Sequence, residues 1–375
     1  MPTITVFTGS AGPGIATAAA ASALHAAAQG RRTLLLSLGP APSLGALLGA
    51  AVGGTPNEVA PGCDALAIDG LRELAEAWER SRQQLPAGAA PIAGDELPLL
   101  PGLEMAFALV RLRDLAPRYD TVMLDAGPYD MLLRSLAAPD GLRWAVRLLF
   151  GLDRGPGRSS ASLARALLPT TFIPIDMLDH VQDARVRAEQ LRDMLIAPRA
   201  AAACYVLRPD HPALEEARIA ISALQLHGLA VPTIAVGPLL PNDLDGTSLA
   251  AYATTQTQML ADVQTIWPAR QLQRFNLTDG RDGRDALERI GAQLAPAESA
   301  RFEAPIATEW AGVPAVAIEL PGLPRHALQL TLSGDELIVR VGDYRRHILL
   351  PESLRGISNI KATREGEYLI VRTRT

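Results

Sequence analysis

The sequence is poor in lysine and cysteine. Only one of its 35 basic residues is a lysine, Lys361, and the rest are arginines. The two cysteines, Cys63 and Cys204, form no C-x-x-C pair, and the six histidines show no ligand spacing. Neither a disulfide scaffold nor a metal site is therefore predicted.

Long apolar runs are also missing. A helix needs about 20 consecutive apolar residues to cross a bilayer, and the apolar stretches of this sequence are shorter. The first residues lack the basic and apolar regions of a signal peptide. We therefore expect a cytoplasmic protein.

The charge balance argues against nucleic acid as a partner. The net charge is -5, and the arginines are interspersed with acidic residues, whereas nucleic-acid binders usually present a basic face. The chain has 375 residues, of which 48% are hydrophobic, so it is long enough for a large core and more than one domain.

Residues 1–294 alternate short β-branched runs with longer helical patterns, which is typical of a mostly parallel, doubly wound sheet with helices on both faces. The expected strands are Thr3–Thr8, Thr33–Leu38, Ala65–Asp69, Thr121–Asp125, Ala201–Leu207, Val231–Val236 and Gln271–Asn276.

The pattern changes in the last part of the chain. Periodicity fades over residues 295–312, where we expect a linker, and alternation with a period of two begins at Val313. A turn is predicted at Ser333–Asp335. Residues 313–375 are thus predicted to form a small all-β, sandwich-like module, which at that size needs packing against the main domain or itself.

The first expected strand runs into a glycine-rich loop and then an alanine-rich helix. This is the architecture of a phosphate-binding P-loop, in which a lysine follows the last glycine and reaches the phosphates. Here Ile15 follows Gly14. Either the glycines merely permit a tight strand-to-helix turn, or the loop keeps a degenerate nucleotide-binding site. The residues expected in such a site are Asp125, at the end of a later strand, and the loop residues Gly9, Ser10, Ala11, Gly12, Pro13, Gly14, Ile15, Ala16 and Thr17.

Several segments in the same order resemble the arsenite-pump and tail-anchored-protein-targeting ATPases, a P-loop family. They are Gly9–Thr17, Ser37–Leu44, Cys63–Asp69, Pro101–Glu104, Leu124–Pro128 and Val236–Pro241. The resemblance implies the P-loop-type fold for residues 1–294, and it implies a homodimer.

Carried over residue by residue, the resemblance implies a dismantled site. Ser10 and Ile15 stand at the family's two lysines, and Ala16 stands at its Mg²⁺-binding hydroxyl. Gly39 stands at the catalytic aspartate, and Gly237 at the adenine-reading asparagine. No catalytic residue is therefore assigned, and weak binding of ATP, ADP or phosphate is the remaining cofactor expectation. Asp125 either keeps a metal-water position or caps the following helix.

The C-terminal module has its own resemblance. Ala315–Gly322 and Leu337–Pro351 resemble the α-crystallin domain of small heat-shock proteins, although a long exchanged loop does not fit after Gly342. A packing role on the ATPase-like domain is the simpler interpretation of this module.

In the ATPases that residues 1–294 resemble, the helices after the segment matched by Leu124–Pro128 form a groove for apolar segments. The residues expected to line such a groove here are Met105, Met131, Leu132, Leu136, Trp144, Leu148, Leu149 and Phe150. Such residues also serve as core or dimer contacts. With hydrophobic protein segments as clients, contact with a membrane would be at most transient.

Three functions stay open at this point. The first is a non-catalytic, chaperone-like or targeting-like protein that binds hydrophobic segments. The second is an ATP-binding ATPase of the arsenite or anion-pump type whose site is completed by non-standard residues, such as arginines across a dimer; Arg134 and Arg143 are examples of arginines that could restore charge. The third is a non-catalytic scaffold.

Overall fold

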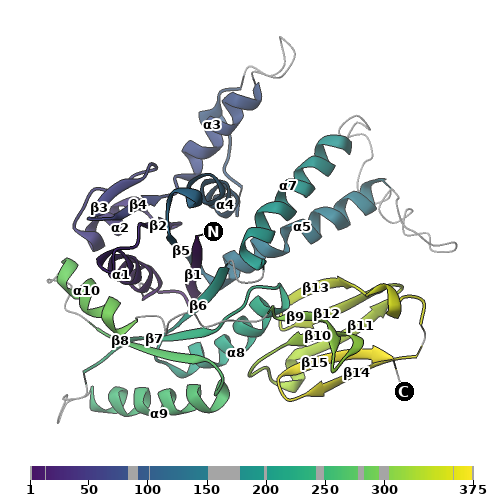
Figure 1. Cartoon of the computed structure of the whole chain (residues 1–375). Helices are drawn as coiled ribbons and strands as arrows, with labels where there is room; N and C mark the ends of the chain where they lie inside the picture. The colour runs from purple at the N-terminus through teal and green to yellow at the C-terminus, as the bar shows by residue number, and fades with distance from the viewer. Residues whose placement is uncertain are drawn as a thin grey trace.

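The computed structural model describes residues 2–12, 14–82, 92–100, 102–150, 178–197, 201–241, 249–277, 283–294, 304–357 and 359–373. In it, an α/β domain carries a β module at its C-terminal end (Figure 1). The strands of the main domain are β1 (Thr3–Gly9), β2 (Thr33–Ser37), β3 (Asn57–Ala60), β4 (Cys63–Ala67), β5 (Thr121–Pro128), β6 (Ala201–Leu207), β7 (Thr233–Leu239) and β8 (Gln271–Asn276). Its helices are α1 (Gly14–Ala28), α2 (Ala41–Leu48), α3 (Gly70–Arg82), α4 (Leu103–Leu115), α5 (Tyr129–Phe150), α7 (Leu178–Ile196), α8 (His211–Leu226), α9 (Ala250–Ile266) and α10 (Gly283–Gln293).

The main sheet has eight strands in the order β3-β4-β2-β5-β1-β6-β7-β8. Every neighbouring pair is parallel except β3 and β4. The seven expected strands and the doubly wound fold are confirmed, with boundaries shifted by a few residues. Because the carboxyl ends of parallel strands share one edge, the segments after β1, β2, β5 and β7 meet there.

The two faces of the sheet bury separate hydrophobic clusters. Helices α1, α2 and α10 cover one face, whereas α4, α5, α7, α8 and α9 cover the other. The alanine-rich sequence of α1 permits close helix packing: a Cβ on Gly291 of α10 would lie 2.5 Å from the carbonyl oxygen of Ala21. The small side chains of α1 thus let another helix approach its backbone.

The C-terminal module consists of two antiparallel sheets. Its strands are β9 (Ile306–Trp310), β10 (Val313–Glu319), β11 (Leu328–Ser333), β12 (Glu336–Val341), β13 (Tyr344–Leu349), β14 (Ile360–Glu365) and β15 (Tyr368–Thr373). The sheet orders are β14-β15-β10-β9 and β11-β12-β13. The predicted turn is confirmed, because Ser333 pairs with Glu336 across Gly334 and Asp335.

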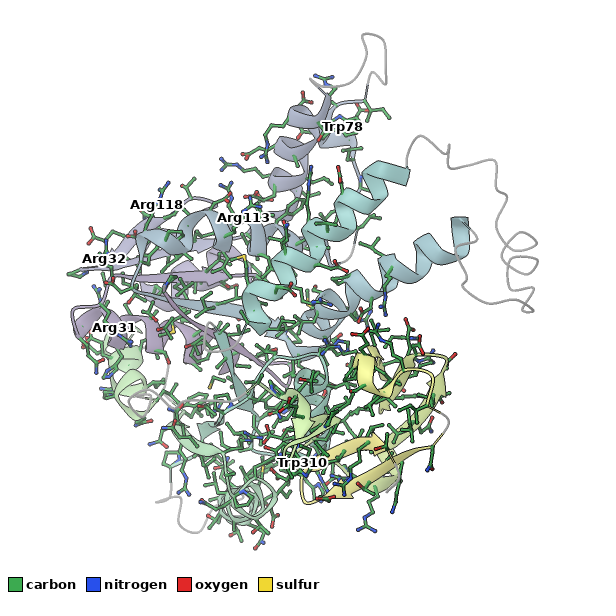
Figure 2. All side chains as sticks on the ribbon, turned by 45° about the vertical axis from the view of Figure 1, so that its right-hand side comes forward. Arg31, Arg32, Trp78, Arg113, Arg118 and Trp310 are labelled. Atoms are coloured by element: carbon green, nitrogen blue, oxygen red, sulfur yellow. The ribbon has the colours of Figure 1, made fainter. Side chains whose placement is uncertain are left out.

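The expected linker needs a correction at its end, since residues 306–310 form β9 and pair with β10. The connection is a two-residue hairpin, Ala311–Gly312, in which both residues have positive φ (50° and 76°). Alanine is uncommon in this conformation, so Ala-Gly is a weaker hairpin signal than Asn-Gly. Figure 2 shows Trp310 in the module. The centroid of its ring lies 4.8 Å from the centroid of the Tyr368 ring.

The module packs on the main domain through the Pro321–Gly322 turn. The Ser222 hydroxyl on α8 and the Trp267 indole both donate to the Pro321 carbonyl, at 3.0 and 3.2 Å. A Cβ on Gly322, whose φ is +68°, would lie 2.7 Å from Ile266 Cγ2. Glycine is required here both for its conformation and for the close approach. One hydrophobic cluster therefore runs from the main sheet into the module.

Candidate functional site

The glycine-rich loop lies at the carboxyl edge of the sheet, between β1 and α1. A Cβ on Gly9 would lie 1.9 Å from the carbonyl oxygen of Val206 on β6, so only glycine fits at the end of β1. The Ser10 amide donates to the same carbonyl at 3.2 Å. Ala11 and Gly12 are exposed, and Pro13 lies outside the described residues. The loop thus has the expected position and an outward-facing tip.

The residues that follow the loop place no charge over it. Ile15 is 3% exposed and belongs to the cluster beneath α1, so its side chain serves the core. Gly14, at the start of α1, is buried, and Ala16 and Thr17 are half-buried. What remains for an anion is the N-terminus of α1, whose free amides and dipole contribute about 0.3–1 kcal/mol when exposed.

A basic side chain does contact the loop, but it is neither Arg134 nor Arg143. Nη1 of Arg208 donates to the carbonyl oxygen of Ala11 at 3.1 Å, and its guanidinium also pairs with Asp210. Arg134 faces Asp130, and Arg143 faces Glu336. Within this chain, Arg208 is thus the arginine that contacts the loop, whereas completion by arginines across a dimer stays a prediction. The strand order could have identified Arg208, because this residue follows β6, which pairs with β1 and ends at the same edge of the sheet.

Other arginines lie far from the loop. Arg31 and Arg32 precede β2, and Arg118 precedes β5, so they lie at the amino ends of the parallel strands. Figure 2 shows these residues together on that side of the domain. Arg32 is held there by Asp120, 3.0 Å away.

Asp125, on β5, is 3% exposed and has its oxygens engaged by the protein itself. The Ser37 hydroxyl donates to Oδ2 at 2.7 Å, and the Gly127 amide donates to Oδ1 at 3.2 Å. Burial raises the pKa of the carboxyl, and the two hydrogen bonds oppose that rise. Because its amide partner, Gly127, precedes α5, the expected role as a helix cap is wrong.

Gly39 lies directly beside this carboxylate. A Cβ on Gly39 would lie 3.7 Å from Asp125 Oδ2 and 3.2 Å from Ser37 Oγ. The Gly39 amide donates to the Ser37 hydroxyl at 2.9 Å. The structure thus brings Gly39 and Asp125 together, with the Ser37 hydroxyl between them.

Gly237, on β7, faces the fully buried Phe275 of β8. A Cβ on Gly237 would lie 2.6 Å from the Phe275 carbonyl and 2.7 Å from its ring. The same ring would lie 3.5 Å from a Cβ on Gly14. Phe275 therefore closes the space next to the loop where an asparagine side chain would have to stand, and sequence analysis did not identify it.

A row of tyrosines connects the loop side of the sheet to the β module. Tyr205 lies opposite Thr8 in the pairing of β6 with β1, next to the buried Ser10. The centroid of the Tyr129 ring lies 6.3 Å from the centroid of the Tyr205 ring and 6.1 Å from that of the Tyr344 ring on β13. The helix that follows Asp125 thus contacts the module at its first residue.

The expected groove residues have different environments. Met105, Leu132 and Leu136 are buried in the main cluster, whereas Met131 is 36% exposed. Trp144, Leu148, Leu149 and Phe150 belong to α5, but their side chains lie outside the described ones. The groove stays a prediction, and the three buried residues already have core partners.

The cysteines are both buried and unpaired, and burial raises the pKa of each thiol to about 12. Within the described ranges, no group of three His, Cys, Asp or Glu side chains is arranged to hold a metal ion. No helix among these residues is long and apolar enough to cross a membrane.

Comparison with known proteins assigns both parts of the chain. Residues 2–295 match the family model of anion-transporting ATPases, and residues 313–372 match that of the HSP20-like domain found in ArsA. An uncharacterised protein of Streptomyces coelicolor is 32% identical over 93% of this chain and 92% of its own length. A protein of Prosthecochloris vibrioformis, provisionally named an arsenical pump-driving ATPase, is 26% identical over 98% of this chain and 94% of its own.

Proposed function

Because the chain belongs to the anion-transporting ATPase family, we propose that it is a member that keeps the fold and has lost nucleotide hydrolysis. The observation that carries this proposal is the burial of Ile15 in the core beneath the loop. Two other features support it: Asp125 is hydrogen-bonded within the protein, and Phe275 fills the space at Gly237.

Charge at the glycine-rich loop limits nucleotide hydrolysis. Phosphoryl transfer depends mainly on positioning and on neutralising the phosphates. A unit charge about 4 Å from a phosphate is worth roughly 4 kcal/mol at an effective dielectric of about 20. Arg208 is half exposed and shared with Asp210, so it replaces only a small part of two lysines and a metal. Weak binding of ATP, ADP or phosphate is compatible with this loop, and rapid hydrolysis is not.

Magnesium dependence tests this proposal. Because no hydroxyl stands at Ala16 and Asp125 is occupied by Ser37, we expect the affinity for ADP, measured by calorimetry, to be the same with and without Mg²⁺. Undetectable ADP binding in both conditions also supports the proposal. A Mg²⁺-dependent gain of about tenfold, equal to 1.4 kcal/mol, would overturn it.

For the cellular role, we propose that α5 contributes to binding hydrophobic protein segments. The exposed Met131 on this helix supports the proposal, since flexible methionine surfaces accept varied apolar partners. Capture of an apolar helical peptide should fall with Met131→Glu and persist with Tyr252→Glu on α9, where Tyr252 is 65% exposed. Equal capture by both variants would argue for a scaffold.

We also propose that the chain forms a homodimer, as the family resemblance implies. Light scattering on the full chain measures this. The competing function, an ATPase completed by other residues, has Arg208 as its best-placed cation. This competing function requires ATP turnover that falls when Arg208 or Asp125 is substituted.

A further inference from the structure

A cluster of charged side chains is enclosed where the main domain meets the β module, away from the glycine-rich loop. Helix α5 packs there against α7 and β13, as Figure 1 shows. The cluster consists of Asp140 and Arg143 on α5, Arg192 on α7, His227 after α8, Glu336 on β12, and Arg346 and His347 on β13. Both domains therefore contribute to it.

The ion pairs inside this cluster are long. Arg143 Nη1 lies 3.7 Å from Glu336 Oε1, and Arg192 Nη1 lies 3.9 Å from Asp140 Oδ1. Well-formed arginine–carboxylate bonds measure about 2.7–2.9 Å. The shorter contacts of the cluster lie elsewhere: Arg192 reaches the exposed Asp193 at 3.3 Å, and His347 reaches Glu336 at 3.4 Å.

Arg346 adds a third guanidinium to the cluster. Its Nη1 donates to the carbonyl oxygen of Leu226, at the C-terminal end of α8, at 2.6 Å. Burial lowers the pKa of Arg346 to about 10 despite the nearby Asp140. Among the described residues of the cluster, three guanidiniums thus face two enclosed carboxylates, so that positive charge exceeds negative charge in this set.

In the part of the chain that the structure describes, several polar atoms of the cluster are enclosed without a hydrogen-bond partner. They include Nε and Nη2 of Arg143, which form one edge of the guanidinium, and Nε2 of His227, a residue that is 2% exposed. Oδ2 of Asp140, one turn before Arg143, is also unpartnered. The cluster therefore has both unused donors and an unused acceptor.

We propose that this junction binds a phosphate group, held by the Nε and Nη2 edge of Arg143 in the field of Arg192 and Arg346. The edge of a guanidinium matches two oxygens of a phosphate or carboxylate. Hydrogen phosphate also carries an O–H that can donate to Asp140 Oδ2, whereas a carboxylate or sulfate ion has no such proton at neutral pH. Free phosphate and a small phosphomonoester both fit the guanidinium edge, but at pH 7.5 free phosphate keeps this proton, whereas a phosphomonoester, whose second pKa is about 6, has mostly lost it.

Occupancy of this site would join the two domains. Asp140, Arg143 and Arg192 come from the main domain, and Arg346 comes from the module, so a bound phosphate stabilises their packing by linkage. This inference is independent of nucleotide chemistry at the glycine-rich loop.

The test is thermal unfolding of the full chain in phosphate, glycerol phosphate, sulfate or acetate at pH 7.5 and matched ionic strength, with affinities from calorimetry. We expect phosphate to raise the unfolding temperature more than sulfate or acetate does. The glycerol phosphate arm separates the two sources: equal or tighter binding identifies a phosphomonoester ligand, and weaker binding identifies free phosphate.

Substitutions locate the site. Arg143→Gln should weaken phosphate binding by about tenfold or more, and Glu336→Gln should strengthen it severalfold. Arg134→Gln is the matched control, because Arg134 lies on the same helix, is 78% exposed and pairs only loosely with Asp130. If Arg143→Gln does not fold, Arg143→Lys replaces it in the test. This variant keeps the charge and removes the two-donor edge, so it should also lose phosphate binding.

Three results would overturn the inference. The first is a phosphate effect no larger than that of sulfate. The second is a loss of binding with Arg208→Ala but not with Arg143→Gln, which would place the phosphate at the loop. The third is an equal loss with Arg134→Gln, which would indicate general charge screening.

Discussion

The hydroxyl of Ser37 donates a 2.7 Å hydrogen bond to Oδ2 of Asp125 and thereby joins the ends of neighbouring strands β2 and β5. The Gly39 amide donates in turn to the same hydroxyl. At the carboxyl edge of the sheet, the Gly39 amide, the Ser37 hydroxyl and the Asp125 carboxylate thus form a continuous hydrogen-bond chain. The contribution of Asp125 to the stability of the fold therefore depends on hydrogen-bond partners that substitutions can remove one at a time.

Removal of the Ser37 hydroxyl should destabilise the protein. Ser37→Ala leaves a buried carboxylate oxygen without its donor, and the expected loss is about 1–3 kcal/mol in the free energy of unfolding at neutral pH. Chemical denaturation measures this loss. The control is Ser135→Ala on α5, where the hydroxyl only donates to the Met131 carbonyl within the helix. An equal loss at both positions would contradict the assignment.

The pH dependence of stability should reveal the raised pKa of Asp125. A carboxyl with a raised folded-state pKa binds its proton more readily in the folded protein, so its contribution falls as the pH rises through that value. Asp125→Asn removes this term. The unfolding temperature of the variant relative to the wild type should therefore be higher at pH 7.5 than at pH 4.5.

Asp120 provides the opposite control. Its hydrogen bonds with Arg32 lower the pKa of this exposed carboxyl. The stabilisation it gives is present at neutral pH and lost as the pH falls, so Asp120→Asn should cost more at pH 7.5 than at pH 3.5. The same sign for Asp120 and Asp125 would show that the local environment of Asp125 is misassigned.

A side chain at position 237 should be poorly tolerated. Gly237→Ala puts a Cβ 2.6 Å from the Phe275 carbonyl, and overpacking of this kind costs about 1–3 kcal/mol. Gly39→Ala is the matched change, because its nearest contacts would be 3.2 and 3.7 Å. Denaturant unfolding should show a clearly larger loss for Gly237→Ala. If Gly237→Ala were neutral, the space beside the loop would be open and a nucleotide base could fit there.

The cation at the loop should contribute modestly to anion binding. Arg208→Ala should weaken phosphate or ADP binding at the loop by about two- to fivefold, corresponding to the 1 kcal/mol or less of an exposed charge. Calorimetry measures this change with Arg134→Ala as the reference. A loss of several hundredfold would instead indicate a fully functional arginine-based site.

The two domains should unfold as one cooperative unit. One hydrophobic cluster runs through both of them, and Gly322 packs against Ile266 and Trp267. Calorimetry should therefore show a single transition, and Gly322→Ala should lower its midpoint, because both the positive φ and the contact at 2.7 Å disfavour a side chain. Gly334→Ala, which has a similar φ but open space, isolates the contact. Two separate transitions would contradict this packing.

The sequence predicted the elements whose side chains follow a simple period. The β-branched runs located the parallel strands, and the alternation after Val313 located the module, because burial on one or both faces imposes those patterns. It missed β9, whose hairpin turn uses Ala311 at a positive φ, and the antiparallel edge strand β3. Short edge strands bury little, so their sequences carry a weak pattern.

The site was harder to predict than the fold. That Ile15 and not a lysine follows Gly14 could be seen within the loop itself. Arg208 and Phe275 could not, because they lie about 200 residues or more from the loop and reach it only through the pairing of β6 with β1 and of β7 with β8. Contacts of this kind depend on the register of the strands, which composition and spacing do not specify.

The release of phosphate from ATP by the full chain, with saturating ATP and Mg²⁺, tests the central claim most directly. We expect the wild type to release phosphate no faster than Asp125→Asn or the buffer containing ATP alone. Turnover above that background that falls when Asp125 is changed to Asn would contradict it and show that hydrolysis survives in this site.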